Sequence, residues 1–405
     1  MKVARQIWID KHLFKPLVIS LNLWVRLLGK ILRIDHRLDK PFTKIAVCKY
    51  KGMGSIIQAT PLLSSLKKRY PNAKISFITT PSNVELLQLT GLVDEIITLN
   101  DRSAFTLLKS FPSFWWKLFT RRYEVYIDLE IYSNFSSFVT TWSMAKNRLG
   151  YYLRSSNYRM GVYTQMMFFN VQAPISECYL QMARALGCTD LQTDLHHFSN
   201  FLSHYEAQLP SKPYFVINPN ASDLRVERKW SPDNFIKLTH HLLQLFPEHE
   251  IYYIGSKNEA DYVNTIVNVI NHERVSSWCG KTDIKKLIFY ISKAEALITN
   301  DTGPMHIGFS LQTPTLALFG PCSPQHYGFN AAFTKILYRQ IYCSPCVHEF
   351  EIPPCNGDNQ CMKLIKIEAV LQALLDLLKK QKQNIEEEPI LYENNKNVFG
   401  FFKRI

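Results

Sequence analysis

The sequence lacks the signals that mark membrane-spanning, secreted or nucleic-acid-binding proteins. Charged residues divide the first apolar stretch, in residues 1–42, so it is not expected to span a bilayer. The same stretch has no small-residue cleavage site, which argues against a secretory signal. No zinc-finger or RNA-recognition signature is present, so we expect no nucleic-acid partner.

Acidic residues are scarce relative to basic ones. The chain has 47 Lys and Arg but 34 Asp and Glu, a net charge of +13, which predicts an anionic partner such as a nucleotide, a phosphorylated glycolipid or a membrane surface. Its 405 residues exceed one ordinary core and predict two domains. Five of the nine cysteines stand singly near apolar positions, and we interpret them as core thiols of a cytoplasmic protein.

Residues 293–321 follow the order strand, tight loop, helix, strand. The apolar runs Ala296–Thr299 and Thr315–Phe319 are typical of buried parallel strands. The unpaired N–H groups at the start of the intervening helix suit a phosphate.

Four residues of this loop and helix are candidate ligand contacts. Gly303 permits close approach, Thr302 offers a hydroxyl, Asp301 suits a sugar or ribose hydroxyl, and His306 follows one turn later. The alternative is a helix cap, a turn glycine and a packed histidine.

The sequence Asn-Asp-Thr-Gly-Pro-Met-His at 300–306, followed by Phe-Gly-Pro at 319–321, resembles glycosyltransferase family 9. The best-known members are ADP-heptose:lipopolysaccharide heptosyltransferases. The resemblance implies that Asp301, Thr302, Gly303 and His306 contact a nucleotide-diphosphate sugar. Strands alternate with helices in both halves, so we predict an α/β GT-B fold, two Rossmann-like domains facing a cleft.

The predicted organisation has five parts. They are a basic amphipathic helical extension (1–42), an N-terminal Rossmann-like acceptor domain (43–200), a C-terminal Rossmann-like nucleotide-sugar domain (211–362), a crossover helix that returns to the first domain (363–382), and a tail (383–405). The extension carries an apolar stripe with Trp24 among basic residues. Such a helix suits the inner face of an anionic membrane, as a peripheral contact, and the alternative is a helix that packs on the main body.

The glycine-rich turn at 51–55 follows a predicted strand, Lys44–Tyr50, and resembles the family's turn on the acceptor side, which includes Gly54. The heptosyltransferases carry an aspartate directly after this glycine, where it is taken to be the general base. Ser55 stands there instead. A serine cannot accept a proton near neutral pH, so that role is vacant or has moved.

The run Glu124–Glu130 predicts a strand that ends in carboxylates. Our hypothesis is that Glu130, at its carboxyl end, supplies the base that Ser55 cannot. The alternative is a carboxylate that pairs with Arg148 or caps a helix. Arg148 lies in a segment similar to the family's path to the acceptor, and its guanidinium suits the phosphates of a glycolipid.

The loop after the predicted strand Tyr214–Ile217 also matches the family's order. The resemblance implies a donor-binding small hydroxyl residue, for which Ser222 is the candidate, and a lysine two residues before the tryptophan. Arg228 stands two before Trp230, keeps the positive charge and can bind a diphosphate through two nitrogens.

Four further cysteines cluster late in the chain, at Cys343, Cys346, Cys355 and Cys361, with His348 among them. They can hold a structural zinc, and the alternatives are free thiols or a disulfide. No cofactor is expected for catalysis.

The resemblance implies inverting, metal-independent transfer of a sugar, heptose by analogy, from an ADP-heptose-like donor to a lipopolysaccharide core or related glycolipid. The alternative is a non-catalytic or altered-specificity protein, which Ser55 favours.

Overall fold

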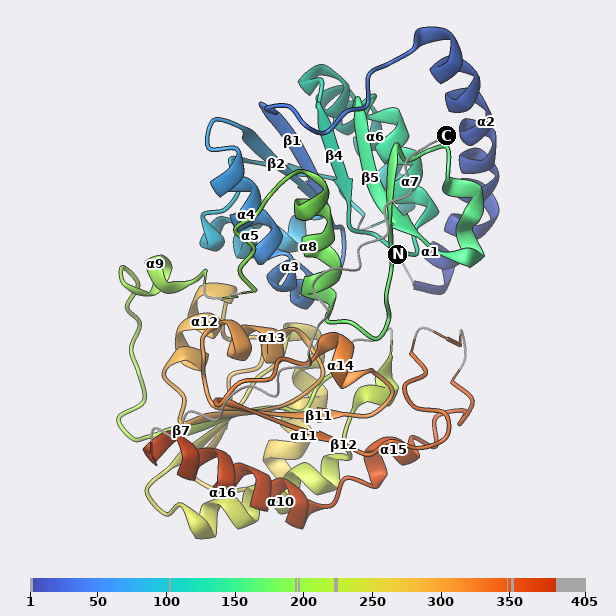
Figure 1. Ribbon diagram of the computed structural model, residues 1–405. Helices are drawn as coiled ribbons and strands as arrows, with labels where there is room; N and C mark the ends of the chain where they lie inside the picture. The colour runs from blue at the N-terminus through green and yellow to red at the C-terminus, as the bar shows by residue number, and fades with distance from the viewer. Residues whose placement is uncertain are drawn as a thin grey trace. The chain divides into compact units, whose positions relative to one another are not determined.

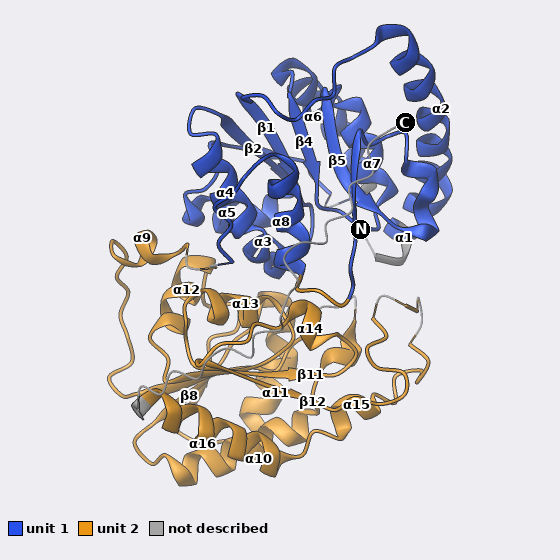
Figure 2. Ribbon diagram, viewed as in Figure 1, with its two compact units in different colours: residues 1–171, 175–194, 395–405 blue, residues 172–174, 195–394 orange. Residues whose placement is uncertain are grey.

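The computed structural model describes residues 3–101, 103–193, 195, 197–221, 225–347, 349–350 and 353–383. The chain divides into two compact units (Figure 2). Unit 1 holds the described residues up to 171 together with 175–193, and unit 2 holds 172–174 and the described residues from 195 onward. Ser222, His348 and residues 384–405 lie outside the described part.

Unit 1 is built on a sheet of six parallel strands in the order β3-β2-β1-β4-β5-β6 (Figure 1). The strands are β1 (Lys44–Cys48), β2 (Lys74–Thr79), β3 (Glu95–Thr98), β4 (Val125–Asp128), β5 (Asn147–Tyr152) and β6 (Gln165–Phe168). The order reverses between β1 and β4. Ligands of doubly wound sheets bind beyond the carboxyl ends of the strands at such a reversal.

Helices cover both faces of this sheet. The core on one face joins residues of α6 (Ala104–Arg121), α7 (Asn134–Trp142) and α2 (Lys15–Leu32) to the strands. The other helices of the unit are α3 (Met53–Gln58), α4 (Thr60–Arg69), α5 (Val84–Thr90) and α8 (Ile175–Ala185), with short 3-10 turns η2 (Pro81–Asn83) and η3 (Arg154–Arg159). Two opposite helix layers are what right-handed crossovers produce when strand order reverses.

The N-terminal extension is helical, as predicted, and belongs to unit 1. It consists of α1 (Val3–Ile9), a π-helical turn η1 (Asp10–Phe14) and α2. Val18 of α2 is fully buried in the core of unit 1. The turn after η3 can approach α2 closely because residue 161 is glycine, where a Cβ atom would clash with Asn22 Oδ1.

Asp10 joins the extension to the first turn of α7. Its Oδ1 accepts hydrogen bonds from the Phe135 amide at 2.8 Å and the Ser133 hydroxyl at 3.1 Å, and its Oδ2 accepts one from the Asn134 amide at 3.0 Å. A carboxylate at a helix N-terminus satisfies unpaired N–H groups and lies at the positive end of the helix dipole. The anchor therefore lies beside the loop that follows β4.

Unit 2 repeats the same plan, with six parallel strands in the order β12-β11-β10-β7-β8-β9. They are β7 (Tyr214–Asn218), β8 (Glu250–Tyr253), β9 (Val275–Ser277), β10 (Ala296–Asn300), β11 (Thr315–Phe319) and β12 (Thr334–Tyr338). The helices are α9 (Ser199–Leu202), α10 (Pro232–Leu245), α11 (Ala260–Ile270), α12 (Ile284–Ser292), α13 (Gly303–Ser310), α14 (Pro324–Tyr327), α15 (Gln360–Lys363) and α16 (Ile367–Gln383), with 3-10 turns η4 (Val226–Arg228) and η5 (Lys257–Glu259).

The order of strands in unit 2 reverses between β7 and β10. The predicted strands at 296–299 and 315–319 are confirmed, as is the prediction of two Rossmann-like units. Their relation across a cleft stays a prediction. None of the helices in the described ranges combines the length and apolar character needed to cross a membrane.

The helix predicted at 363–382 is present as α16, and its return to the first domain stays a prediction. Its apolar stripe, including Val370, Leu374 and Leu377, is buried in the core of unit 2, together with Trp230 and residues of α10 and α11. The helix therefore contributes to the core of unit 2. The apolar spacing predicted the helix correctly, but spacing alone does not identify the surface that accepts it.

Replacing Asp10 by alanine tests the anchor of the extension. The loss of the acceptor for the Asn134 and Phe135 amides is expected to lower the local stability of the α7 start by about 1–2 kcal/mol. Native-state hydrogen exchange should then accelerate at these two amides. Asp35→Ala is the control, because Asp35 accepts hydrogen bonds from Arg37 and Lys40, which lie in the extension itself. Unchanged exchange at both amides in Asp10→Ala would contradict the anchor.

Candidate functional site

The predicted donor loop lies at the strand-order reversal of unit 2. Strand β10 ends at Asn300, Thr302 is the N-cap with extended backbone, and α13 begins at Gly303. Residues 302–304 are partly exposed, whereas Asp301 and His306 are almost fully buried. The start of α13 is therefore accessible, and the two flanking side chains face protein on most sides.

Three buried asparagines brace this edge of the sheet. Asn218 donates to the hydroxyls of Thr299 at 3.0 Å and Thr302 at 2.7 Å. Asn300 donates to the carbonyls of Pro219 and Asn220, and its Oδ1 accepts the amide of Trp230 at 3.2 Å. Asn220 donates to Asn218 Oδ1. The network fixes the loop after β7 against the loop after β10.

Sequence reasoning did not assign a role to these asparagines. The signal was present, since the sequence Asn-Pro-Asn directly follows a buried strand and Asn300 ends another. The carboxyl ends of adjacent parallel strands meet at one edge, so polar side chains there are brought together. Thr302 is also accounted for by this network, because its hydroxyl donates to the carbonyl of Asn300 at 3.3 Å.

Arg228 and Asp301 form an ion pair beside the start of α13. Arg228 Nη1 lies 3.6 Å from Asp301 Oδ2 and donates to the Asp301 carbonyl at 3.1 Å. Within the described residues, neither Arg228 Nε nor Asp301 Oδ2 has a hydrogen-bond partner, although both atoms are buried. Buried polar atoms are normally satisfied, so each such atom requires an explanation.

His306 lies in the first turns of α13, close enough to Asp301 and Arg228 to interact electrostatically. Burial lowers the pKa of His306 from 6.5 to about 4, with the nearby Arg228 guanidinium acting in the same direction and Asp301 opposing. The imidazole is therefore neutral near pH 7. A neutral imidazole can both donate and accept a hydrogen bond, whereas an imidazolium only donates.

In unit 1 the glycine-rich turn lies at the corresponding reversal. Gly52 has φ of +91°, a backbone conformation that favours glycine, and it is the N-cap of α3, which contains Gly54 and Ser55. Gly54 is buried and Ser55 is half-buried. Ser55 also lies beside the Tyr179 hydroxyl, whose pKa burial raises to about 12.

Glu130 lies two residues after β4, at the same edge. Its Oε2 pairs with Lys49 Nζ at 2.9 Å, and its Oε1 accepts the amides of Tyr50 at 2.7 Å and Lys51 at 3.2 Å. Both carboxylate oxygens are thus engaged in holding the turn that leads to Gly52. The alternative partner considered from the sequence, Arg148, is not the one found.

Arg148 lies at the amino end of β5, the opposite edge from Glu130. Its Nε donates to the Val162 carbonyl at 2.7 Å and its Nη1 to the Ala145 carbonyl at 2.8 Å. The residue is buried, and the geometry gives no support to an acceptor-phosphate contact. Arg159, which sequence reasoning passed over, instead binds the loop after β4 through the carbonyls of Ile131 and Tyr132.

The four late cysteines are free thiols, with Cys346 and Cys361 buried and Cys343 and Cys355 partly exposed. Burial, together with the neighbouring cysteines, raises the pKa of Cys361 to about 11. Among the residues that the structure describes, no three His, Cys, Asp or Glu side chains are grouped to hold a metal. His348 lies outside those residues, and the zinc stays a prediction.

Relatives with known names support the same two-unit plan. Among solved structures, E. coli ADP-heptose lipopolysaccharide heptosyltransferase II aligns with a TM-score of 0.66 at 19% identity, covering 84% of this chain and 100% of that one. The E. coli heptosyltransferase WaaC with ADP aligns with a TM-score of 0.66 at 16% identity, covering 83% and 100%. At these identities the likeness shows the fold.

Curated sequences give closer matches over shorter stretches. Lipooligosaccharide heptosyltransferase 2 of Campylobacter jejuni is 30% identical over 173 residues, 42% of this chain and 52% of the relative. Lipopolysaccharide heptosyltransferase 3 of Escherichia coli is 24% identical over 286 residues, 66% and 79%. The chain thus spans about half the length of the first of these relatives.

The family itself is established by a match to a family-wide sequence profile. The profile described as glycosyltransferase family 9 (heptosyltransferase) matches residues 112–355, which is more than half of the chain. The match includes β4, the loop after β7 and the whole segment from β10 to β11. The chain therefore belongs to glycosyltransferase family 9.

Proposed function

We propose that this protein transfers a sugar, heptose by analogy with its relatives, from an ADP-heptose-like donor to a lipopolysaccharide core or related glycolipid. The observation that carries the proposal is the pair of buried, unsatisfied atoms Arg228 Nε and Asp301 Oδ2 beside the α13 start. A diphosphate sugar supplies an acceptor for the first and hydroxyl donors for the second. Family membership supports the same reading.

The donor would bind with its diphosphate at the α13 N-terminus. The acceptor hydroxyl oxygen attacks the anomeric carbon, the bond from that carbon to the diphosphate oxygen breaks, and the configuration inverts. The leaving diphosphate gains negative charge in the transition state. In the proposed mechanism, Arg228 and the positive end of the α13 dipole stabilise that charge, and no metal ion is required for this role.

The acceptor proton needs a base, and the hypothesis for it is Glu130. A base other than Ser55 is needed, because the serine side chain has no basic group. The position of Glu130, beside the strand-order reversal of unit 1, supports the hypothesis. Its three hydrogen bonds support a second role, positioning of the glycine-rich turn. These roles differ in their kinetic consequences, so mutation separates them.

The second candidate function is binding of a nucleotide-sugar or glycolipid without transfer, or with a different donor. Ser55 favours it, because the aspartate expected of a heptosyltransferase is missing at that position. Tight ADP binding by calorimetry without transfer to any glycolipid in a membrane extract supports binding alone. Tighter binding of UDP than of ADP supports a different donor.

Arg228→Ala is expected to weaken binding of an ADP-sugar by about 1.5–3 kcal/mol, because a charged hydrogen-bonding group is removed from the diphosphate. This corresponds to roughly 10- to 150-fold in Kd by isothermal titration calorimetry. The affinity of Arg228→Lys should lie between those of the wild type and Arg228→Ala, because lysine keeps the charge but not the forked geometry. The control is Lys237→Ala on the exposed side of α10, which should bind like the wild type. Equal affinity of Arg228→Ala and wild type would remove the proposed diphosphate contact.

Glu130→Gln keeps the shape of the side chain but removes its charge. If Glu130 is the base, kcat should fall by about 10²–10⁴-fold with little change in the KM for the donor. If it only positions the turn, the loss should be smaller and Lys49→Met should reproduce it, because that variant removes the ion pair from the other side. Normal turnover in Glu130→Gln would exclude both roles.

His306 predicts a pH dependence of stability. Its pKa is about 4 in the folded protein and 6.5 for the ordinary side chain, so below pH 6.5 the unfolded state binds the proton more strongly. The free energy of unfolding should therefore fall between pH 6.5 and pH 4, by about 3 kcal/mol in total. His306→Asn should lose less stability than wild type over this range in urea titrations. Parallel curves for the two proteins would contradict a buried neutral imidazole.

A further inference from the structure

Helix α2 carries large apolar side chains on its outer as well as its inner side. Val18 is buried in the core of unit 1, and Leu21 packs against that core. The opposite side exposes Ile19, Leu23, Trp24, Leu27, Leu28 and Ile31, and Leu23 is 70% exposed. A surface helix normally has polar residues on its exposed side, so an apolar stripe there is unusual and indicates an interaction surface.

Helix α6 repeats the feature. Phe114 and Leu118 are buried in the same core. Phe105, Leu108, Trp116 and Phe119 follow one another at three- to eight-residue intervals on the other side and are exposed, Trp116 by 58%. Two helices of one unit thus present apolar outer stripes.

The two stripes belong to one layer of helices. Both α2 and α6 pack on α7, and all three contribute to the core on one face of the unit 1 sheet. Figure 1 shows α2 on the outer side of this unit beside α7. Trp115 of α6 and Trp142 of α7 contact each other edge to face at 5.8 Å, and Trp142 is itself partly exposed. We call the outer surface of α2, α6 and the end of α7 the α2–α6 face.

The charge of this layer has one sign. The sequences of α2, α6 and α7 contain six Lys and Arg residues and no Asp or Glu. Arg121 pairs with Glu95. The other five have no carboxylate partner among the residues that the structure describes, namely Lys15, Arg26, Lys30, Lys109 and Lys117. Apolar stripes bordered by unpaired cations are typical of helices that lie in an anionic lipid interface.

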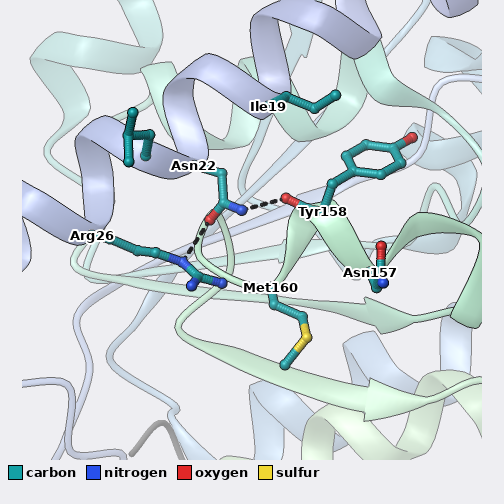
Figure 3. A pocket seen from close by; sticks show the side chains of 7 residues that line it. Ile19, Asn22, Arg26, Asn157, Tyr158 and Met160 are labelled. Carbon is teal, nitrogen blue, oxygen red and sulfur yellow. Dashed lines mark hydrogen bonds between the residues drawn. The ribbon is translucent and has the colours of Figure 1, made fainter.

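A pocket opens at the edge of this face (Figure 3). Its volume is about 390 Å³, and it lies between α2 and the turn that follows β5, with Ile19, Leu23 and Arg26 on one side and Tyr158 and Met160 on the other. Asn22 donates to the Tyr158 carbonyl at 2.6 Å and accepts from Arg26 Nε at 3.1 Å. The guanidinium is thus held at the wall of a pocket lined by both polar and apolar side chains, a combination that suits a phosphate attached to an acyl chain.

We propose that the α2–α6 face is a docking surface for an anionic phospholipid bilayer, with the apolar stripes in the interface and Arg26 near a lipid phosphate. A second copy of the chain is the rival occupant. Face-to-face pairing would oppose the cations of one copy with those of the other, with no acidic residue of these helices to neutralise them. The proposal does not depend on sugar transfer.

The test is cosedimentation of the full chain with vesicles of phosphatidylcholine alone and of equal amounts of phosphatidylcholine and phosphatidylglycerol. The wild type should bind the anionic vesicles at least about tenfold more strongly, and added salt should weaken this binding. Leu23→Glu and Trp116→Glu should each lower binding by roughly tenfold, because each places a charge in the apolar stripe. Arg26→Gln should reduce the preference for anionic vesicles.

The matched control is Val269→Glu, since Val269 is 61% exposed on α11 in unit 2. It should bind vesicles like the wild type, and circular dichroism melting should confirm that all variants fold. Equal binding of Leu23→Glu, Trp116→Glu and wild type overturns the proposal. The proposal is also overturned if the wild type does not bind vesicles but forms dimers in light scattering, and Leu23→Glu is monomeric.

Discussion

The ion pair between Arg228 and Asp301 is the interaction on which the proposed donor site depends. It joins the segment after β7 to the loop after β10, and buried asparagines hold both segments in place. The carboxyl ends of parallel strands meet at one edge of the sheet, and this pair lies at the point of that edge where the strand order reverses. The pair leaves one nitrogen of Arg228 and one oxygen of Asp301 buried without a hydrogen-bond partner, and the proposed donor would supply partners for both.

The first unit uses the same geometry for a different purpose. At its reversal, Glu130 accepts the amides that start the glycine-rich turn and pairs with Lys49, so both oxygens of this carboxylate hold neighbouring parts of unit 1. The extension adds a second carboxylate, Asp10, at the start of α7. The loops at this edge are therefore held by charges from two separate parts of the chain.

The elements that the sequence predicted well are those with strong local patterns. The apolar runs of β10 and β11 and the turn at Gly303 are readable because strand length and turn residues are local properties. The partners of Glu130, Arg148 and α16 were not predictable, since each depends on which surface lies opposite in the fold. An apolar stripe such as that of α16 predicts that one side of the helix is buried, but it does not identify the residues that pack against it. The asparagine network needed the strand order before its members could be seen as one group.

The glycine at position 161 has a consequence for protein engineering. A side chain there would collide with Asn22, so the extension and the turn after β5 form a matched set. A chimera that grafts residues 1–42 onto another member of the family keeps the Asn22 side chain in its present position only where the recipient has glycine at this turn. A larger residue there would displace the Asn22 side chain and with it the hydrogen bond that Asn22 donates to the Tyr158 carbonyl.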